Sequence, residues 1–289
     1  MIEEPRWFVN VELSPDGRFL ALGVSGANET IWLYELARGD LTRFTFRFDN
    51  ATPQWSPDGE RLVFTSDRDG PFNLFQRAVN SNDPVERLAT SDSMQFPGSW
   101  TPDGDSLVFA ESRPGTGWDV WRLRLSDDRV AGDRVPEALL QEPYHERRPR
   151  LSPDGRWLAY VSDESGQNEV YIRSFPELGS KQKVSLDGGM DHQWSADGSE
   201  LFFRNGDDLH VVEIGSNAKL EIGSPRLLFS RSFPGHSATP FAISFGYSLY
   251  DVTPDGQRFV AFEEEESEPE PTHLNLILNW AEELKRLVP

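Results

Sequence analysis

The sequence contains no cysteine, no long apolar run and few basic residues, and each absence excludes a class of structure or function. Without cysteine the chain forms no disulfide and offers no thiolate as a metal ligand or nucleophile. No stretch approaches the ~20 apolar residues needed to cross a bilayer, and the first residues lack the basic and apolar regions of a signal peptide. We therefore expect a soluble chain with no membrane segment, which is also compatible with one domain of a longer secreted or membrane-tethered protein.

The charge is strongly one-sided, with 28 lysine and arginine residues against 48 aspartate and glutamate residues, a formal net charge of −20 at pH 7. Such a chain repels the phosphates of nucleic acids and anionic lipid surfaces, so neither is an expected partner. It favours cations or a basic protein surface. Acidity also keeps a protein soluble in its own right, and the sequence leaves both interpretations open.

One tetrapeptide recurs six times along the chain. Ser14-Pro15-Asp16-Gly17 is followed by closely similar segments at residues 56–59, 101–104, 152–155, 195–198 and 253–256. Proline sets the first central position of a β-turn, aspartate caps the neighbouring backbone, and glycine takes the positive φ that follows. Strand-rich repeats with a period of ~40–50 residues are typical of propeller blades.

These repeats predict an all-β fold, a single six-bladed β-propeller over residues 1–289 with four antiparallel strands in each blade. Residues 19–22, 31–34 and 226–229 are examples of the expected second, third and fourth strands of a blade. A helical interpretation finds no support in this alternation of short apolar and polar segments.

Three tryptophans, Trp55, Trp100 and Trp194, precede a turn at one repeated position. Because one sheet cannot bury both of its faces, blades must pack against each other, and we expect these side chains between blades. A platform on which a carbohydrate stacks is the alternative.

The last repeat has no obvious fourth strand. We expect residues 273–280 to form its third strand, and residues 2–5 to supply the outer strand that closes the ring. The tail, residues 281–289, begins with the amphipathic string AEELKRL, which predicts a short C-terminal helix packed on the outside.

The six Ser/Thr-Pro/Ala-Asp-Gly units resemble the Pro-Asp repeat of TolB-type propellers, which are relatives of the WD repeat. Residues 166–176, 250–259 and 278–289 are more closely similar to the carboxy-terminal propeller of large bacterial serine/threonine protein kinases. This resemblance covers nearly the whole chain and implies a sensing or scaffolding module of a larger signalling protein, extracytoplasmic if a membrane segment precedes it. The kinase motifs themselves are missing from the sequence, and the family supplies no catalytic residues for the propeller.

Seven residues are candidates for ligand binding, and we expect no catalytic residue and no metal ligand. The seven are Asp191, His192, Tyr144, His145, Arg148, His236 and Tyr250. Asp191 and His192 precede the fifth turn on the expected innermost strand, and the others lie in or beside two long blade-to-blade connections, residues 141–149 and 230–247. No pair of histidines has the spacing of a preformed metal site, so a structural role is the alternative for each of them.

Acidic residues gather in loops that we expect on one face of the propeller, at residues 66–70, 162–166, 205–208 and 263–266. This arrangement predicts an electronegative face that attracts a basic peptide or calcium. None of the loops has the spacing of an EF-hand, and loops are also polar simply because water surrounds them. We expect no cofactor, with calcium the one ion compatible with these loops.

The preferred interpretation is a non-catalytic, monomeric propeller that binds a protein, peptide or small ligand at this loop face. The alternative is a propeller lyase or hydrolase with a metal-assisted site in the central channel, around Asp191, His192 and residues 141–149. A periplasmic scaffold like TolB is a third interpretation, although the amino-terminal domain that it would need is missing from the sequence.

Overall fold

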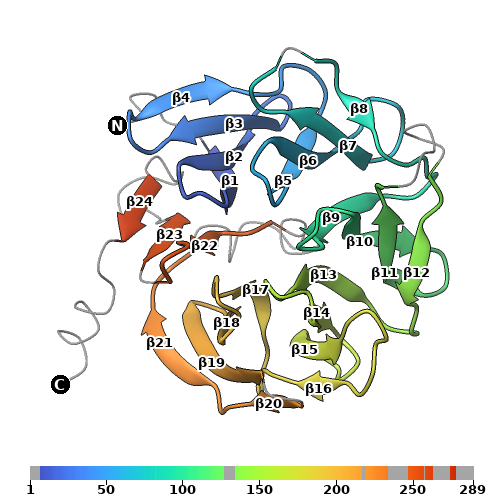
Figure 1. Ribbon diagram of the computed structural model, residues 1–289, viewed down its shortest axis with the longest axis vertical. Coiled ribbons are helices and arrows are strands. Elements are labelled where there is room, and N and C mark those ends of the chain that lie inside the picture. The colour runs from blue at the N-terminus through green and yellow to red at the C-terminus, as the bar shows by residue number, and fades with distance from the viewer. Residues whose placement is uncertain are drawn as a thin grey trace.

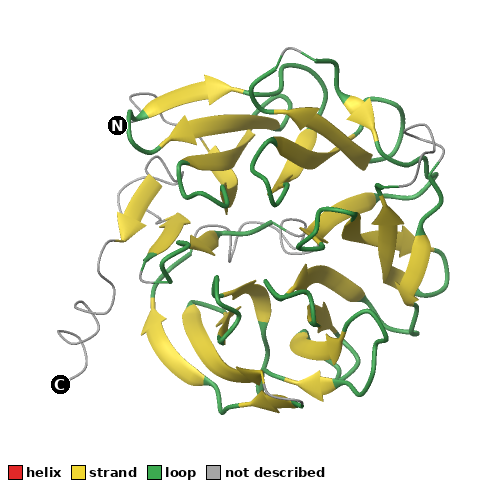
Figure 2. Ribbon diagram, viewed as in Figure 1, coloured by secondary structure: helices red, strands yellow, loops and turns green. Residues whose placement is uncertain are grey.

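The computed structural model describes residues 7–81, 83–126, 134–216, 219–233, 247–256, 258–262 and 274–277. Every regular element among these residues is a β-strand, as Figure 2 shows. The strands form six antiparallel sheets that follow one another in chain order around a common centre (Figure 1). The prediction of an all-β propeller with antiparallel sheets is confirmed.

The first four sheets have four strands each, in the order predicted. The first sheet consists of β1 (Trp7–Leu13), β2 (Phe19–Ser25), β3 (Thr30–Glu35) and β4 (Asp40–Arg43). The second consists of β5 (Asn50–Trp55), β6 (Arg61–Ser66), β7 (Asn73–Ala78) and β8 (Glu86–Arg87). The third consists of β9 (Gln95–Trp100), β10 (Ser106–Arg113), β11 (Gly117–Arg124) and β12 (Glu137–Leu140). The fourth consists of β13 (Glu146–Leu151), β14 (Trp157–Ser162), β15 (Glu169–Ser174) and β16 (Gln182–Lys183).

The fifth and sixth sheets depart from this pattern. The fifth consists of β17 (Met190–Trp194), β18 (Glu200–Asn205), β19 (Asp208–Ser216), β20 (Leu220–Ile222) and β21 (Arg226–Ser230). Its third strand, β19, is long enough to pair with β21 through its first residues and with β20 through its last. The sixth consists of β22 (Tyr250–Val252), β23 (Phe259–Phe262) and β24 (Leu274–Ile277). The prediction of four strands in every blade is therefore wrong for the fifth sheet, whereas the fourth strand predicted for the last blade lies outside the described residues.

The expectations about ring closure fall partly outside the described residues. β24 confirms the third strand expected within residues 273–280. The outer strand expected at residues 2–5 and the helix expected in residues 281–289 both lie outside the part of the chain that the structure describes.

The six motif turns have one geometry and join the first and second strands of each sheet. The φ angle of the glycine is 69° at Gly17 and 75° at Gly104, and the other four lie between 66° and 72°. In the first turn the Ser14 hydroxyl donates to Oδ1 of Asp16 at 2.6 Å and accepts from the amide of Phe19 at 2.9 Å. The face that carries these turns is the turn face. The opposite face, with the sheet-to-sheet connections and the loops between second and third strands, is the loop face.

Apolar clusters lie between successive sheets, and one of them closes the ring. Val260 and Phe262 of β23 pack with Phe8, Leu20 and Leu22 of the first sheet. The rings of Phe8 and Phe262 stack with centroids 5.7 Å apart. The first and last sheets are thus joined by the same apolar packing that joins all other neighbours.

The three repeated tryptophans belong to these clusters. Trp55 packs in the cluster between the first and second sheets, Trp100 in the next, and Trp194 in the cluster between the fourth and fifth. Their predicted position between blades is confirmed.

Candidate functional site

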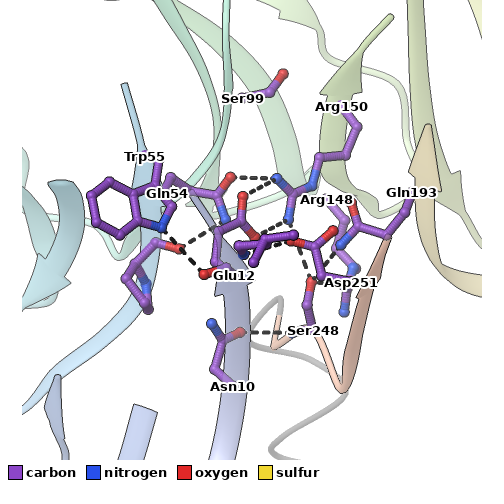
Figure 3. A network of polar contacts seen from close by, with 12 residues as sticks. Asn10, Glu12, Gln54, Trp55, Ser99, Arg148, Arg150, Gln193, Ser248 and Asp251 are labelled. Carbon is purple, nitrogen blue, oxygen red and sulfur yellow. Dashed lines mark hydrogen bonds and ion pairs between the residues drawn. The ribbon is translucent and has the colours of Figure 1, made fainter. Parts of the chain in front are cut away.

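The innermost strands bring one polar side chain from each sheet toward the centre of the ring. Each lies two residues before the first residue of a motif turn, and we name these six the axial set: Glu12, Gln54, Ser99, Arg150, Gln193 and Asp251. Figure 3 shows how they gather from the different strands. Because alternate residues of a strand point to opposite faces, the same offset from the turn reaches the axis in every sheet.

Arg150 is the hub of the axial set. Its Nη1 and Nη2 donate to Oε1 and Oε2 of Glu12, both at 3.2 Å, and Nη1 also donates to Oε1 of Gln54. Its Nη2 contacts Oγ of Ser248 at 3.4 Å, which also accepts from Nε2 of Gln193 at 3.1 Å. One guanidinium therefore joins strands of the first, second and fourth sheets and the segment that enters the sixth.

Ser99 and Asp251 hold backbone amides of neighbouring sheets instead. Oγ of Ser99 accepts from the amide of Leu151 at 2.7 Å, and Oδ2 of Asp251 accepts from the amide of Leu13 at 2.6 Å. Burial, together with the charge of Glu12, raises the pKa of Asp251 well above its ordinary value.

A second buried ion pair lies closer to the loop face. Nη2 of Arg148 is 2.6 Å from Oδ1 of Asp191, and the two side chains are 8% and 3% exposed. Asp191 also lies 3.4 Å from Nη1 of Arg204 and accepts from the amide of Leu249 at 3.2 Å. Both members of the pair have a positive φ, 55° for Arg148 and 50° for Asp191, a conformation that costs about 1–3 kcal/mol for such residues. The surrounding contacts must offset that strain.

Five largely buried charged side chains near the axis are paired with one another. Arg150 pairs with Glu12, and Arg148 and Arg204 both pair with Asp191. Removing one partner of a buried pair leaves an uncompensated charge and costs ~3–5 kcal/mol. These buried ion pairs therefore hold the innermost strands of different sheets together.

Four of the seven candidate residues lie together in this buried layer. Arg148 and Asp191 form the ion pair, and His192 is fully buried beside them. Burial and the charges of Arg148 and Arg150 lower the pKa of His192 well below its ordinary value, so the imidazole is neutral at pH 7. Tyr250 is also buried, and burial with the charge of Asp191 raises its pKa.

The other three candidates are not part of this layer. Tyr144 is exposed in the connection between β12 and β13. The backbone amide of His145 donates to Oδ1 of Asp163 at 2.9 Å, and its Nδ1 accepts from the amide of Trp118 at 3.2 Å. His236 lies outside the described residues. A role in ligand binding stays a prediction for all seven.

None of the axial set was among the candidates named from the sequence, although Arg150 joins more strands than any of those candidates. The signal was present, because a polar residue stands at the same offset from the turn in all six repeats. A strand buried on both faces would have apolar residues there, so six polar residues in register indicate a shared polar environment.

The loop face exposes large apolar side chains in a regular way. Five of them lie in sheet-to-sheet connections, and we name them the exposed apolar set: Phe46 and Phe48 before β5, Met94 before β9, Tyr144 before β13 and Leu186 before β17. Their exposed fractions run from 39% to 65%. Four successive connections therefore each offer apolar surface on one face.

Acidic side chains outnumber basic ones in the described loops of the same face. The acidic residues are Glu29, Asp49, Asp67, Asp69, Asp92, Glu142, Asp163, Glu164, Asp187 and Asp207, and the basic ones are Arg47, Arg68 and Arg231. Hydrogen bonds hold these loops together, since Oδ1 of Asp49 accepts from the amide of Glu29 at 2.7 Å and Oδ1 of Asp67 from the amide of Asp49 at 2.9 Å. The predicted acidic loop regions at residues 66–70, 162–166 and 205–208 lie on this face, whereas residues 263–266 lie outside the described residues.

Neither a metal centre nor a membrane-spanning helix is found in the described part of the chain. No three histidine, aspartate or glutamate side chains in this part of the chain are grouped so that they could hold a metal ion. The same residues include no helix with the length and apolarity needed to cross a membrane. Calcium binding stays an expectation from the sequence.

Comparisons with known proteins agree with the repeat. Residues 8–131 match the model of the TolB beta propeller domain. Over 77 residues the chain is 30% identical to the Tol-Pal system protein TolB of Hydrogenovibrio crunogenus, and this segment is 27% of the chain and 18% of that relative. The match thus spans less than a fifth of the length of this curated relative.

Solved structures with the same architecture include a putative TolB and an enzyme. A putative TolB from Agrobacterium tumefaciens superposes with a TM-score of 0.64 at 19% identity, over 79% of this chain and 83% of that one. An oligogalacturonate lyase in complex with manganese superposes with a TM-score of 0.62 at 18% identity, over 96% of this chain and 75% of that one. At such identities the similarity shows the fold alone. The similarity to kinase-associated propellers stays a prediction, and residues 8–131 are similar to the TolB beta propeller domain, while the solved structures extend the propeller fold to most of the chain.

Proposed function

We propose that the chain is a non-catalytic binding module whose loop face docks a polypeptide partner. The observation that carries this proposal is the exposed apolar set, which places large apolar side chains in four successive connections of one face. Exposed apolar surface rimmed by polar residues is a common mark of protein interaction sites. Burying one such Phe or Leu side chain contributes roughly 1.5–3 kcal/mol, so a few of them suffice for a specific complex.

The charges of the same face indicate the chemistry of the partner. Acidic residues surround the exposed apolar set and outnumber basic ones there. A basic segment with apolar side chains would match both features, because its lysines and arginines are steered by the acidic loops. We therefore propose a basic, apolar-anchored polypeptide as the occupant of the loop face.

In this proposal the six sheets act as the six blades of one ring, and the propeller is the sensing or scaffolding part of a larger bacterial signalling protein. The resemblance of residues 166–176 and 250–259 to kinase-associated propellers supports this placement. The pairing of Arg150 with Glu12, and of Arg148 and Arg204 with Asp191, supports a non-catalytic role.

The test is a binding assay on immobilised synthetic peptides in which basic and apolar residues alternate, with acidic peptides of the same apolar content beside them. We expect the protein to bind the basic series, and the double variant Phe46→Ser, Leu186→Ser to bind it about tenfold more weakly or worse. Leu227→Ser is the matched control, since Leu227 is half exposed on β21, outside the connections. Equal binding of basic and acidic peptides, or equal loss in the control, would remove the loop face as the site.

A metal-assisted lyase is the alternative, and the manganese-bound oligogalacturonate lyase of similar fold provides its substrate assay. The protein would be incubated with oligogalacturonate and manganese and followed for the unsaturated product of elimination. We expect no turnover. Turnover that is lost in His192→Ala would replace the binding proposal with an enzyme.

A further inference from the structure

A cleft of about 610 Å³ opens on the turn face between the second and third sheets. Its lining comes from two motif turns, from strands β6 to β9 and from the loop that precedes β12: Ser56, Pro57, Asp58, Arg61, Gln76, Glu86, Trp100, Pro102, Asp103, Gly104, Leu125 and Arg134. We propose that this cleft binds a small zwitterionic ligand, one with a carboxylate and an ammonium group. The cleft lies on the face opposite to the exposed apolar set, so this site and the loop-face site can be tested independently.

The first observation is that a contact repeated around the ring is missing here. In four of the six junctions the glycine of one motif turn lies against the proline of the preceding turn. A Cβ atom added to Gly155 would lie 3.0 Å from Cδ of Pro102, one added to Gly198 would lie 3.4 Å from Cδ of Pro153, and the pairs Gly17–Pro254 and Gly59–Pro15 are similar at 3.5 and 3.9 Å. A Cβ atom added to Gly104 would meet no described atom within 4 Å, although proline is present at position 57.

The comparison with the other open junction is instructive. A Cβ atom added to Gly256 of the sixth turn would also meet no described atom within 4 Å, but the preceding turn has Ala196 in place of proline. There the sequence itself removes the contact. Between the second and third sheets the sequence provides both residues, and the two turns stand apart on either side of the cleft.

The second observation concerns the tryptophan at the end of the innermost strand. Nε1 of Trp55 donates to the carbonyl of Glu12, and Nε1 of Trp194 donates to the carbonyl of Arg150, both at 3.2 Å. In each case the acceptor is the penultimate residue of the preceding innermost strand, so Gln54 would be the equivalent acceptor for Trp100. Nε1 of Trp100 is instead buried and has no hydrogen-bond acceptor among the described residues. Leaving a buried donor unpaired is unfavourable, and a ligand acceptor would satisfy it.

Arg134 adds a cation whose hydrogen bonds are also incomplete. Its side chain is 12% exposed, and its Nε and Nη1 have no hydrogen-bond acceptor in the described part of the chain. The carboxylate nearest to it is that of Glu86, with Nη1 and Oε1 3.8 Å apart. Oε2 of Glu86 is already occupied, because it accepts from Nε2 of Gln76 at 2.8 Å. A carboxylate of a ligand fits the planar donors of an arginine.

Carboxylates of the two turns supply the opposite charge. Hydrogen bonds from the Ser56 hydroxyl and the Glu60 amide lower the pKa of Asp58, and those from the Thr101 hydroxyl and the Asp105 amide lower the pKa of Asp103. Both groups are therefore ionised at neutral pH. A cleft with unpaired donors and cations as well as fixed carboxylates suits a ligand that carries both charges, and about 610 Å³ is within the usual range of ligand pockets.

The carboxylate of such a ligand has two sources, a free amino acid or the end of a short peptide. The experiment follows the indole N–H resonances of the nitrogen-labelled protein, with that of Trp100 assigned from its loss in Trp100→Phe. The probes are the free proteinogenic amino acids, dipeptides with free termini and the same dipeptides with an amidated carboxyl end, each at millimolar concentration. We expect the Trp100 resonance to shift with at least one carboxylate-bearing probe and not with its amide.

The variants test the same point through affinity. Trp100→Phe keeps an aromatic ring and removes the N–H, and Arg134→Gln removes the charge, so each should weaken binding of that probe about tenfold or more. Trp194→Phe is the matched control, because its N–H is already paired with Arg150, and it should bind as the unaltered protein does. The spectra also show whether each variant is folded. No shift with any probe, an equal shift with the amidated dipeptides, or equal weakening in the control would overturn the proposal. A shift with amino acids but not dipeptides, or the reverse, would identify the source of the carboxylate.

Discussion

The third blade packs against the fourth through close backbone contacts, and it faces the second across a cleft. On the side of the fourth blade, a Cβ atom added to Gly98 would lie 2.3 Å from the carbonyl oxygen of Pro149, and the amide of Leu151 donates to Ser99. On the other side, Nε1 of Trp100 has no acceptor among the described residues, and a Cβ atom added to Gly104 would meet none of their atoms within 4 Å. An apolar cluster fills the middle of both junctions.

This difference shows that a repeat specifies each blade more strictly than it specifies the junctions between blades. The second, third and fourth turns all have proline, aspartate and glycine, with glycine φ angles of 70–75°. Yet of the two junctions between these three sheets, only that of the third and fourth brings proline and glycine into contact. Gly98 stands at a position where the other innermost strands have larger residues, and it allows the close approach of β9 to β13.

The largest expected effect is the loss of stability caused by adding a methyl group at Gly98, where the third and fourth sheets are in close contact. Gly98→Ala would place a methyl group against the carbonyl of Pro149, and because backbone cannot move aside as a side chain does, we expect a loss of about 3 kcal/mol or more in the free energy of unfolding. Urea denaturation measures it. Gly104→Ala, at a φ of 75° but in open space, should lose only about 1 kcal/mol. Similar losses for the two variants would contradict the contrast between the junctions.

The second largest expected effect is a dependence of stability on pH, caused by a carboxyl group that is buried where the third and fourth sheets meet. Burial raises the pKa of Glu146 to about 8, with the charges of Glu142 and Asp119 adding to it. The folded chain thus keeps a proton that the unfolded chain releases near pH 4.5. The contribution of this protonated carboxyl group to the free energy of unfolding is complete at low pH and is lost as pH rises toward 8. We expect the free energy of unfolding to fall over this range, with a slope of up to ~1.4 kcal/mol per pH unit.

Glu146→Gln should flatten this slope. The quantity to measure is the difference between the unaltered protein and the variant in how the free energy of unfolding depends on pH. The difference is needed because Glu29, with a pKa raised to about 7 by burial, contributes a similar fall to both curves. Glu86→Gln is the control at the open junction, where the side chain is 39% exposed. If both substitutions flattened the curve equally, the burial of Glu146 would not be its cause.

The smallest effect compares two tryptophans at the same repeated position. Trp194→Phe removes a hydrogen bond to the carbonyl of Arg150 and should cost about 1 kcal/mol of stability. Trp100→Phe removes an N–H that has no acceptor in the described structure, so it should be neutral or slightly stabilising. The same denaturation experiment gives both values. A loss in Trp100→Phe equal to that in Trp194→Phe would mean that its indole is paired in solution.

Much of the fold was predictable because it depends on interactions between residues that are close together in the sequence. A turn of four residues needs only its own side chains and a glycine with positive φ, and all six formed as predicted. The tryptophans could be placed between blades because their position repeats. The strand count in the fifth sheet was not predictable, since it depends on the length to which β19 extends and on its pairing with both β20 and β21.

The candidate site was predictable only in part. Asp191 and Arg148 were identified separately, but their ion pair joins strands of two sheets and forms where irregular pairing bends both strands. The same irregularity breaks the simple alternation of side chains that would tell from the sequence which way each residue points. His192 was named with a structural role as the alternative, and its side chain is fully buried.

By itself the sequence determined the repeat, the turns, the apolar faces of the strands and the polar residue two positions before each turn. Only the tertiary structure decided that Arg150 pairs with Glu12, that Gly98 meets Pro149, and that a cleft opens beside Trp100. The physical reason is the range of the interactions. Turns and strands are set by neighbours in the chain, whereas the junctions and the axis are set by residues that meet only after the ring has formed.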